Sequence, residues 1–306
     1  MSDAGLIFPL LGLRRGIGVF GHERTSAHRG DGYETASSRT YMPGDNMRLI
    51  DWGASARLSS ARDADEFIVR EHFAEERPRV VVFVDRRPSM ALFPPGLPWL
   101  HKPVAVGVAG RMIIDSALAA RGLPGYLDLG EPQRPVWVPP RRRRDARLIR
   151  EEALTRTAFG APEDGLALGL RRLLRARADL PRGSFLFVLS DFLAPPPAAT
   201  WALAAEHGLD VVPVVLQDPR WEQSFPDAHG LVLPFAEAGG ALRPARLTRR
   251  EAAERRRASE ERLAALLSGF AALRLDPVLL SSDDPVEVLA AFLRWHDRRH
   301  TRLRQR

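Results

Sequence analysis

The sequence predicts an α/β domain built on a doubly wound, mostly parallel sheet of about six strands, with helices on both faces. Two short runs, residues 80–84 (VVVFV) and 184–189 (SFLFVL), are apolar without alternation, as expected of strands buried on both faces. Helical stretches separate the strand candidates along the chain. This alternation predicts βαβ crossovers with right-handed connections over residues 77–299.

The composition is that of a folded protein with a basic surplus. Of 306 residues, 45% are hydrophobic and 27% are charged, so we expect a well-formed core. The chain has no cysteine, which excludes disulfides and thiolate metal sites and fits a reducing compartment. The net charge is +7, and Lys102 is the only lysine beside many arginines. We interpret this surplus as genomic base composition, with a phosphate-binding surface as the alternative.

The sequence contains no pattern typical of secretion or membrane insertion. Residues 6–13 (LIFPLLGL) are apolar, but the run is short, contains a proline and lacks a basic flank and a cleavage site. No run of about 18 apolar residues occurs. We therefore expect a soluble cytoplasmic protein.

The first two segments differ from the rest of the chain. Residues 1–38 are rich in Gly, Ser, His and Arg without a sustained period, and we predict a partly ordered N-terminal arm. Residues 39–76 are expected to pack on the core. Within them, residues 43–45 (PGD) predict a turn, and Asp51 a helix N-cap. Residues 65–76 could form an edge strand running into the central one.

Charged and aromatic residues crowd into the segment at residues 39–57. They are Arg39, Tyr41, Asp45, Arg48, Asp51, Trp52 and Arg57. Two interpretations stay open. Ion pairs could pin a turn and a helix against the sheet, with Trp52 as a packing anchor. Alternatively, the segment could be a docking surface for another protein, because Arg, Tyr and Trp are common interface hot spots.

The remaining elements alternate in type. Residues 103–120 predict a helix, with proline at its start and Gly122 just past its end. Further helices are predicted at residues 145–155, 164–178, 198–206, 248–273 and 285–296, the last two capped by Thr248 and Asp284. Further strands are predicted at residues 126–129, 135–138, 209–216 and 275–280, with a small β excursion over residues 221–244. The basic tail, residues 300–306, is expected to fray.

Two aspartates mark the candidate site. Asp85 follows the first apolar strand directly, and Asp191 follows the second. In open α/β sheets, ligand-handling groups gather just past the carboxyl ends of the strands. We therefore predict a partner-binding edge there, formed by Asp85, Arg86, Arg87, Ser89 and Asp191.

One run carries a family resemblance. The pattern RxYxPGDxxRxIDWxxxAR is met by Arg39, Tyr41, Pro43, Gly44, Asp45, Arg48, Ile50, Asp51, Trp52, Ala56 and Arg57. A Glu-rich segment and the run VVVFVDRRPSM follow. The chain thus resembles the bacterial family known as domain of unknown function 58, which is similar to von Willebrand factor type A domains. The resemblance extends from about Gly21 to the closing helix. It implies a Rossmann-like sandwich and a protein partner, an AAA+ ATPase of the MoxR type.

The resemblance also implies a place for a divalent cation, and the sequence departs from it. Type A domains often bind the ion through an Asp-x-Ser-x-Ser run, a later Thr and a later Asp. Asp85, Ser89 and Asp191 match three of these positions, whereas Arg87 replaces the middle serine. The loop at residues 159–167, which should supply the threonine, has no hydroxyl.

Two hypotheses follow for this degenerate metal-ion-dependent adhesion site. In the first, Arg87 pairs with Asp85 or Asp191 and replaces the metal, so that no cofactor is needed. In the second, Arg87 turns outward, and Asp85, Ser89 and Asp191, with Asp164, hold a weakly bound Mg²⁺.

No pattern in the sequence assigns a reaction. The eight histidines are scattered, and no GxxxxGK[ST] phosphate loop occurs. We therefore expect a non-catalytic interaction module, an adaptor for the ATPase in protein assembly or remodelling. A metal-dependent hydrolase of phosphate esters is one alternative. Another is a nucleic-acid-binding protein that uses the four arginines at residues 141–144 and the basic tail.

Overall fold

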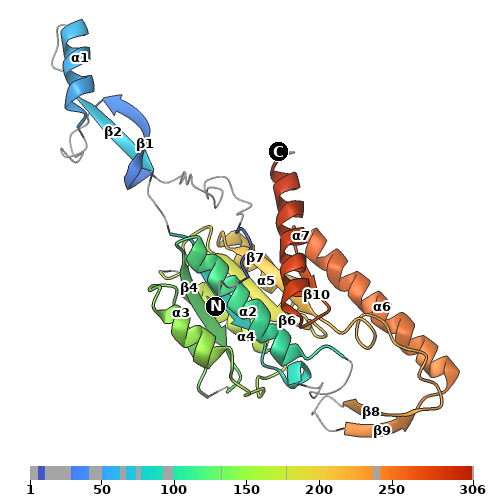
Figure 1. The fold of residues 1–306 in the computed structure, drawn as a ribbon. Helices are drawn as coiled ribbons and strands as arrows, with labels where there is room; N and C mark the ends of the chain where they lie inside the picture. Colours follow the sequence, from blue (N-terminus) through green and yellow to red (C-terminus); the bar gives the residue numbers. More distant parts are fainter. Residues whose placement is uncertain are drawn as a thin grey trace. The chain divides into compact units, whose positions relative to one another are not determined.

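The computed structural model describes residues 6–10, 29–40, 50–62, 67–73, 77–91, 99–131, 133–176, 178–236 and 242–304. The chain divides into two compact units, drawn in Figure 1. The larger unit comprises residues 1–10 and 78–306, and the smaller comprises residues 11–77.

A six-stranded sheet forms the centre of the larger unit. Its strands are β3 (Arg79–Val84), β4 (Leu123–Asp128), β5 (Val136–Val138), β6 (Phe185–Ser190), β7 (Asp210–Leu216) and β10 (Val278–Leu280). Their order is β10-β7-β6-β3-β4-β5, and the pairs are parallel except for β4 with β5. The chain leaves β3 toward β4 on one side and later returns to β6 on the other. The predicted doubly wound α/β fold is therefore confirmed.

Helices cover both faces of this sheet (Figure 1). The longer ones in the described chain are α2 (Lys102–Ala119), α4 (Gly165–Arg175), α5 (Ala198–Glu206), α6 (Arg249–Ala272) and α7 (Pro285–Arg304). Shorter ones are η2 (Pro88–Ala91), α3 (Asp145–Leu148) and the π-helical turn η3 (Ile149–Ala153). Side chains alternate between the two faces along each strand, so each strand contributes to two cores.

The two cores use different helices. Phe83 and Val188 pack with buried residues of α4, α5 and α6, such as Phe270. On the opposite face, the Phe187 ring meets Phe292 and Trp295 of α7. Helix α2 packs against β3, β4 and α7.

Residues 6–10 belong to the core of the larger unit. Phe8 is 3% exposed, and its ring stacks on that of Phe292 at 4.3 Å. The Phe8 backbone N–H donates to Ser116 Oγ at 3.0 Å. Part of the segment predicted as a partly ordered arm is thus packed between helices, because its apolar residues bury surface there.

The smaller unit contains two antiparallel strands and a helix. The strand β2 (Ile68–Phe73) pairs with β1 (Arg29–Thr40), so the segment predicted as an edge strand leading into the central strand belongs to a separate two-stranded sheet. The strand β1 was not predicted, because its polar sequence shows no sustained alternation. The helix α1 (Trp52–Arg62) begins after Asp51, whose Oδ1 accepts a hydrogen bond from Ala54 N at 3.0 Å. The predicted N-cap is confirmed.

The family run falls within the smaller unit. Trp52 is 61% exposed and meets Phe67 edge-to-face at 5.9 Å, so within its own unit it is not a packing anchor. Arg39 lies in β1 opposite Val69, and Arg57 is exposed on α1. Five residues of the run lie outside the described residues: Tyr41, Pro43, Gly44, Asp45 and Arg48. The packing of residues 39–76 on the core stays a prediction.

The C-terminal elements follow the predicted order. Thr248 and Glu251 form a capping box at the start of α6. The strands β8 (Val232–Ala236) and β9 (Leu242–Arg246) form the small β excursion. Asp284 caps α7, which continues through residues 300–304, so this part of the tail is helical and not frayed. None of the helices that the structure describes has the length and apolarity needed to traverse a bilayer.

Candidate functional site

The two predicted aspartates lie side by side at the carboxyl ends of β3 and β6. The parallel register pairs Val84 with Leu189, and the Asp85 N–H donates to the Leu189 carbonyl at 2.9 Å. Asp191 follows one residue beyond β6. Because the strand order reverses between these two strands, the site occupies the topological switch point of the sheet.

Arg87 forms a fork onto the Asp85 carboxylate. Its Nε lies 2.9 Å from Asp85 Oδ2 and its Nη2 lies 2.7 Å from the same oxygen, while the Arg87 backbone N–H donates to Oδ1 at 3.0 Å. Ser190 Oγ donates to Oδ2 at 2.7 Å. The pairing of Arg87 with Asp85 is therefore confirmed. Asp191 is a weaker partner, with its Oδ1 at 3.8 Å from Nη2.

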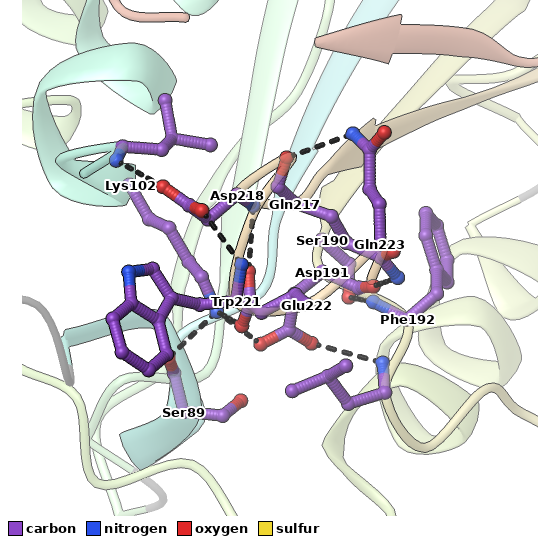
Figure 2. A network of polar contacts seen from close by, with 12 residues as sticks. Ser89, Lys102, Ser190, Asp191, Phe192, Gln217, Asp218, Trp221, Glu222 and Gln223 are labelled. Carbon is purple, nitrogen blue, oxygen red and sulfur yellow. Dashed lines mark hydrogen bonds and ion pairs between the residues drawn. The ribbon is translucent and has the colours of Figure 1, made fainter. Parts of the chain in front are cut away.

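A second cation, Lys102, lies beside the first. Its side chain is fully buried at the start of α2. Its Nζ donates to Asp191 Oδ2 at 2.9 Å, to the Ser89 carbonyl at 3.1 Å and to Glu222 Oε1. Figure 2 shows Glu222 and Ser89 lying on either side of this ammonium. Asp85, Arg87, Lys102, Asp191 and Glu222 are named here the C-terminal-edge cluster.

Lys102 and Glu222 are site residues that no sequence pattern predicted. Lys102 is the single lysine of the chain, and its position before a proline indicates only the start of a helix. Glu222 lies in the connection after β7, far from Asp191 in sequence. A lone lysine in an arginine-rich chain was the available signal, because burial beside two carboxylates suits a compact ammonium.

The charges of this cluster set its protonation. Burial alone would lower the pKa of Lys102, but Asp191 and Glu222 outweigh burial and raise it. Burial alone would raise the pKa of Asp191, but the Lys102 ammonium holds it below its ordinary value. The pKa of Glu222 is raised, first by burial and then by repulsion from Asp191, although Lys102 opposes both. One ammonium thus serves two carboxylates, and Asp191 is the better stabilised of them.

The backbone after Asp191 is strained. Phe192 adopts φ 49°, a left-handed conformation that is uncommon for an aromatic residue. Its N–H donates to Ser190 Oγ at 2.9 Å, and its buried ring packs with Trp201 and Phe270. Such strain persists only where the surroundings hold it, and it concentrates at functional sites.

A ring of buried polar groups supports the cluster (Figure 2). Gln217 Nε2 donates to the Asp191 carbonyl at 2.6 Å. Asp218 accepts from the N–H groups of Leu100, Arg220 and Trp221 at 2.8 to 2.9 Å. The connection after β7 is therefore tied both to the segment before α2 and to the cluster.

Arg86 points away from the other site residues. It is 2% exposed, and its guanidinium donates to the Arg156 and Ala153 carbonyls at 2.6 and 3.0 Å. Its Nη2 also lies 3.2 Å from the hydroxyl of Tyr126, whose pKa burial raises. Arg86 thus ties the end of β3 to η3 and β4, and does not contact Asp191.

The predicted partner-binding edge stays a prediction, but most of its side chains are buried. Asp85, Arg86, Arg87 and Asp191 are each 5% exposed or less, so in this conformation their side chains cannot form a contact surface. Only Ser89 among the predicted residues is partly exposed. The buried cations instead hold the backbone of the segments that follow β3 and β6, because Lys102 donates to the Ser89 carbonyl and Arg87 donates to the Ala194 carbonyl.

The donor groups present do not fit a divalent cation in this arrangement. Both oxygens of Asp85 accept from Arg87, and Asp191 accepts from Lys102 and from Leu193 N at 3.1 Å. A metal ion would have to displace these cations from the carboxylates. Asp164, offered as a further ligand, is exposed and lies 3.6 Å from Arg171. Among the residues that the structure describes, no three His, Cys, Asp or Glu side chains are grouped to hold one ion.

Fold and site together define an open α/β protein with a charge-compensated cluster at its switch point. The chain belongs to the family described as "Protein of unknown function DUF58", whose model matches residues 37–263. Uncharacterized proteins of Mycobacterium bovis and Mycobacterium tuberculosis are 27% identical to it over 216 residues. This match covers 69% of the chain and 62% of each relative, so the chain spans less than two thirds of their length.

A solved structure is also similar. It is that of the conserved hypothetical protein BatB from Bacteroides thetaiotaomicron, at 12% identity and a TM-score of 0.38, covering 73% of this chain and 99% of that one.

Proposed function

We propose that this protein is a non-catalytic interaction module whose contact surface is the set of loops above the C-terminal-edge cluster. The observation that carries this proposal is that the buried cations hold backbone carbonyls of η2 and of the loop after β6, as well as carboxylates. Lys102 donates to the Ser89 carbonyl at 3.1 Å, and Arg87 Nη1 donates to the Ala194 carbonyl at 2.8 Å. Asp218 holds the N–H groups of Arg220 and Trp221. Three segments at this edge, namely η2, the loop after β6 and the connection after β7, are thus held by one buried polar network.

The chemistry of the cluster supports a role without catalysis. A general base works best when its pKa lies near the operating pH. The pKa of Asp191 is held low by Lys102, which makes this carboxylate a weak base. Glu222 has a raised pKa, but its Oε1 accepts from Lys102 and its Oε2 accepts from Asp218 N at 2.9 Å. Neither carboxylate has a position open toward a substrate.

The same geometry supports binding without a metal ion. In this proposal, Arg87 and Lys102 supply the two positive charges that a divalent cation would bring. Burial lowers the pKa of Arg87 and its pairing with Asp85 raises it, with a net increase, so its charge is permanent. Recognition through these loops would therefore be insensitive to chelators.

The proposed partner is an AAA+ ATPase of the MoxR type, and the process is protein assembly or remodelling. This part of the proposal rests on family membership and on the resemblance carried by the PGD and IDW residues. A preformed, rigid set of loops suits it, because rigid surfaces lose little conformational entropy on binding. We place the protein in the cytoplasm, where such ATPases have access to ATP.

The test of this proposal is association of the two purified proteins. The MoxR-type ATPase of the same organism is mixed with the protein, and the complex is measured by analytical ultracentrifugation. The Ala194→Arg variant alters an exposed loop position, and we expect it to weaken association by about tenfold or more, as at an interface centre. The matched control is Ala258→Arg, which makes the same change on exposed α6. Equal effects of the two variants, or no complex with the parent protein, would contradict the proposal.

A separate measurement tests the metal-free cluster. Mg²⁺ and Mn²⁺ are titrated by calorimetry into chelator-treated protein and into the Arg87→Ser variant. We expect no heat of binding in the parent and measurable binding in the variant, because the substitution frees Asp85 and adds a hydroxyl. Arg142→Ser, at an exposed arginine, is the control. Binding by the parent would show that a metal ion displaces the arginine.

A further inference from the structure

A pocket of about 250 Å³ lies on the outer side of α4. One wall is a stripe of this helix, and the other comes from the connection between β4 and β5 and from the segment before α4. The lining residues are Leu129, Pro135, Pro162, Leu168, Arg171, Arg172 and Arg175. None of them belongs to the C-terminal-edge cluster.

The helix places three arginines and one leucine on a single face. Positions 168, 171, 172 and 175 are three, four and seven residues apart, which aligns them along one side. The opposite side of α4 is buried in the core, and Gly169 lies so close to Phe83 that an added Cβ would meet its ring at 2.1 Å. This close packing holds α4 in one orientation about its own axis, so the side chains at positions 168, 171, 172 and 175 face away from the core. Leu168 on that stripe is 40% exposed.

The positive charge on this stripe is largely uncompensated. The sequence of α4, GLALGLRRLLR, contains no acidic residue, so intrahelical ion pairs are impossible. Arg171 lies 3.6 Å from Asp164, and no carboxylate of the described chain contacts Arg172 or Arg175. The contrast with α6 is clear, because there Arg250 pairs with Glu254 at 2.7 Å.

Favourable interaction with the helix dipole accounts for part of this arrangement. Cations in the last turn of a helix stabilise it, which suits Arg172 and Arg175. The dipole does not account for the exposed Leu168, which lines the same pocket as Pro135 and Pro162. A partly apolar pocket with arginines along it has the features of a binding surface.

We infer that this pocket binds an acidic peptide segment of a partner protein, with one apolar side chain of that segment inserted between Leu168 and the prolines. The pocket is smaller than the roughly 300–1,000 Å³ typical of cofactor and drug-sized ligands, and it suits one or two side chains. Guanidinium groups bind carboxylates through paired hydrogen bonds, which favours Asp and Glu beside the apolar anchor. The inference goes beyond the proposed function, since it uses other residues and does not need the loops above the cluster.

The experiment uses the whole chain and a defined probe. A fluorescein-labelled peptide with the sequence Glu-Leu-Asp-Phe repeated three times is titrated with protein, and binding is followed by fluorescence anisotropy. The double variant Arg172→Ser/Arg175→Ser should bind about tenfold more weakly, because two charge-assisted contacts are lost. Arg142→Ser/Arg144→Ser removes the same charge from another exposed segment and should bind as the parent does. Leu168→Ser should weaken binding several-fold without any change in charge.

The outcomes separate a pocket from general electrostatic attraction. Selective loss in the α4 double variant together with loss in Leu168→Ser supports the inference. Equal loss in both double variants, no effect of Leu168→Ser, or no binding by the parent would overturn it. All substituted side chains are on the surface, and circular dichroism checks that each variant is folded. Association with the ATPase through the loops would be unchanged in the α4 variants, so each proposal can fail separately.

Discussion

The six-stranded sheet buries charged groups at both of its ends, and the two groups are built differently. The C-terminal-edge cluster lies where β3 and β6 end. At the other end lie Asp210 at the start of β7, Asp276 before β10, and Arg299 and Arg302 of α7. These four residues are named here the N-terminal-edge cluster.

The N-terminal-edge cluster is incompletely hydrogen-bonded. Arg299 is fully buried and donates through Nη2 to Asp210, but its Nε and Nη1 find no hydrogen-bond partner in the part of the chain that the structure describes. Its Nε lies 3.9 Å from Asp276 Oδ2, which also has none there. The guanidinium lies 4.6 Å from the centre of the Trp295 ring, within the range of a cation–π contact.

The difference indicates what each cluster does. Arg299 attaches α7 to the sheet, and aromatic packing supplies much of its surroundings. Lys102 instead donates to three oxygen acceptors, and one of them is a backbone carbonyl of η2. A fully satisfied buried polar network rigidifies its surroundings and specifies one arrangement. The C-terminal end of the sheet is therefore the end whose loop geometry is fixed by charge.

The largest expected effect comes from Lys102→Met. The substitution leaves Asp191 and Glu222 buried without their shared cation, and removal of one partner from a buried ion pair costs about 3–5 kcal/mol. We expect urea denaturation followed by circular dichroism to show a loss of about 4 kcal/mol in the free energy of unfolding. The triple variant Lys102→Met/Asp191→Asn/Glu222→Gln should recover part of this loss. A loss below about 1 kcal/mol would contradict the assigned role of the ammonium.

A smaller effect is expected from Arg299→Leu. Leucine keeps apolar contact with Trp295 and Phe185, and it removes two buried N–H donors that lack partners. Asp210 loses its guanidinium but is bordered by other groups, so we expect a loss of about 2 kcal/mol by the same denaturation measurement. If Arg299→Leu cost as much as Lys102→Met, the distinction between the two clusters would be wrong.

The smallest effect is expected from Asp191→Asn, and it depends on pH. The amide can still accept from Leu193 N, Lys102 keeps Glu222, and repulsion between the two carboxylates disappears, so the loss at pH 7 should be about 1 kcal/mol. Because folding lowers the pKa of Asp191, the unfolded chain binds more protons as the pH falls below 3.8. The stability from this carboxylate is present above that pH and is lost below it.

Denaturation curves between pH 2 and pH 7 check this prediction. Below about pH 4, the free energy of unfolding should fall less steeply in Asp191→Asn than in the parent. Equal slopes would mean that Asp191 is not held ionised by Lys102. Asp227→Asn serves as a comparison, because the pKa of this surface carboxylate is also lowered, first by its bond to His229, and solvent screening should make its change of slope smaller.

Much of the sheet and part of the site could be predicted from the sequence. Unbroken runs of Val, Phe and Leu identify β3 and β6, because a strand buried on both faces has no polar side. The aspartates at their ends then come together by topology alone. The pairing of Arg87 with Asp85 was also predictable, since the two residues are only two positions apart and share one turn.

Other parts depend on contacts that no local pattern records. Lys102 meets Glu222 only because α2 and the connection after β7 both lie near the end of β6. The two residues are 120 positions apart, and no pattern in either segment predicts this contact. Phe8 enters the core from an apolar run too short to identify an element. The strand β1 is polar throughout and is recognised only by its pairing with β2. Within the smaller unit, the exposure of Trp52 likewise depends on packing and not on the residue type.

The single lysine of the chain has a chemical consequence. Its ε-amine is fully buried and its pKa is raised, so amine-acylating reagents reach it only when the structure around it opens. Acylation of this one position, counted by mass spectrometry, would therefore measure how often the protein opens at Lys102 under native conditions, without any engineered label. The rate at which Lys102 is acylated would therefore report how often the buried contacts around its ammonium break.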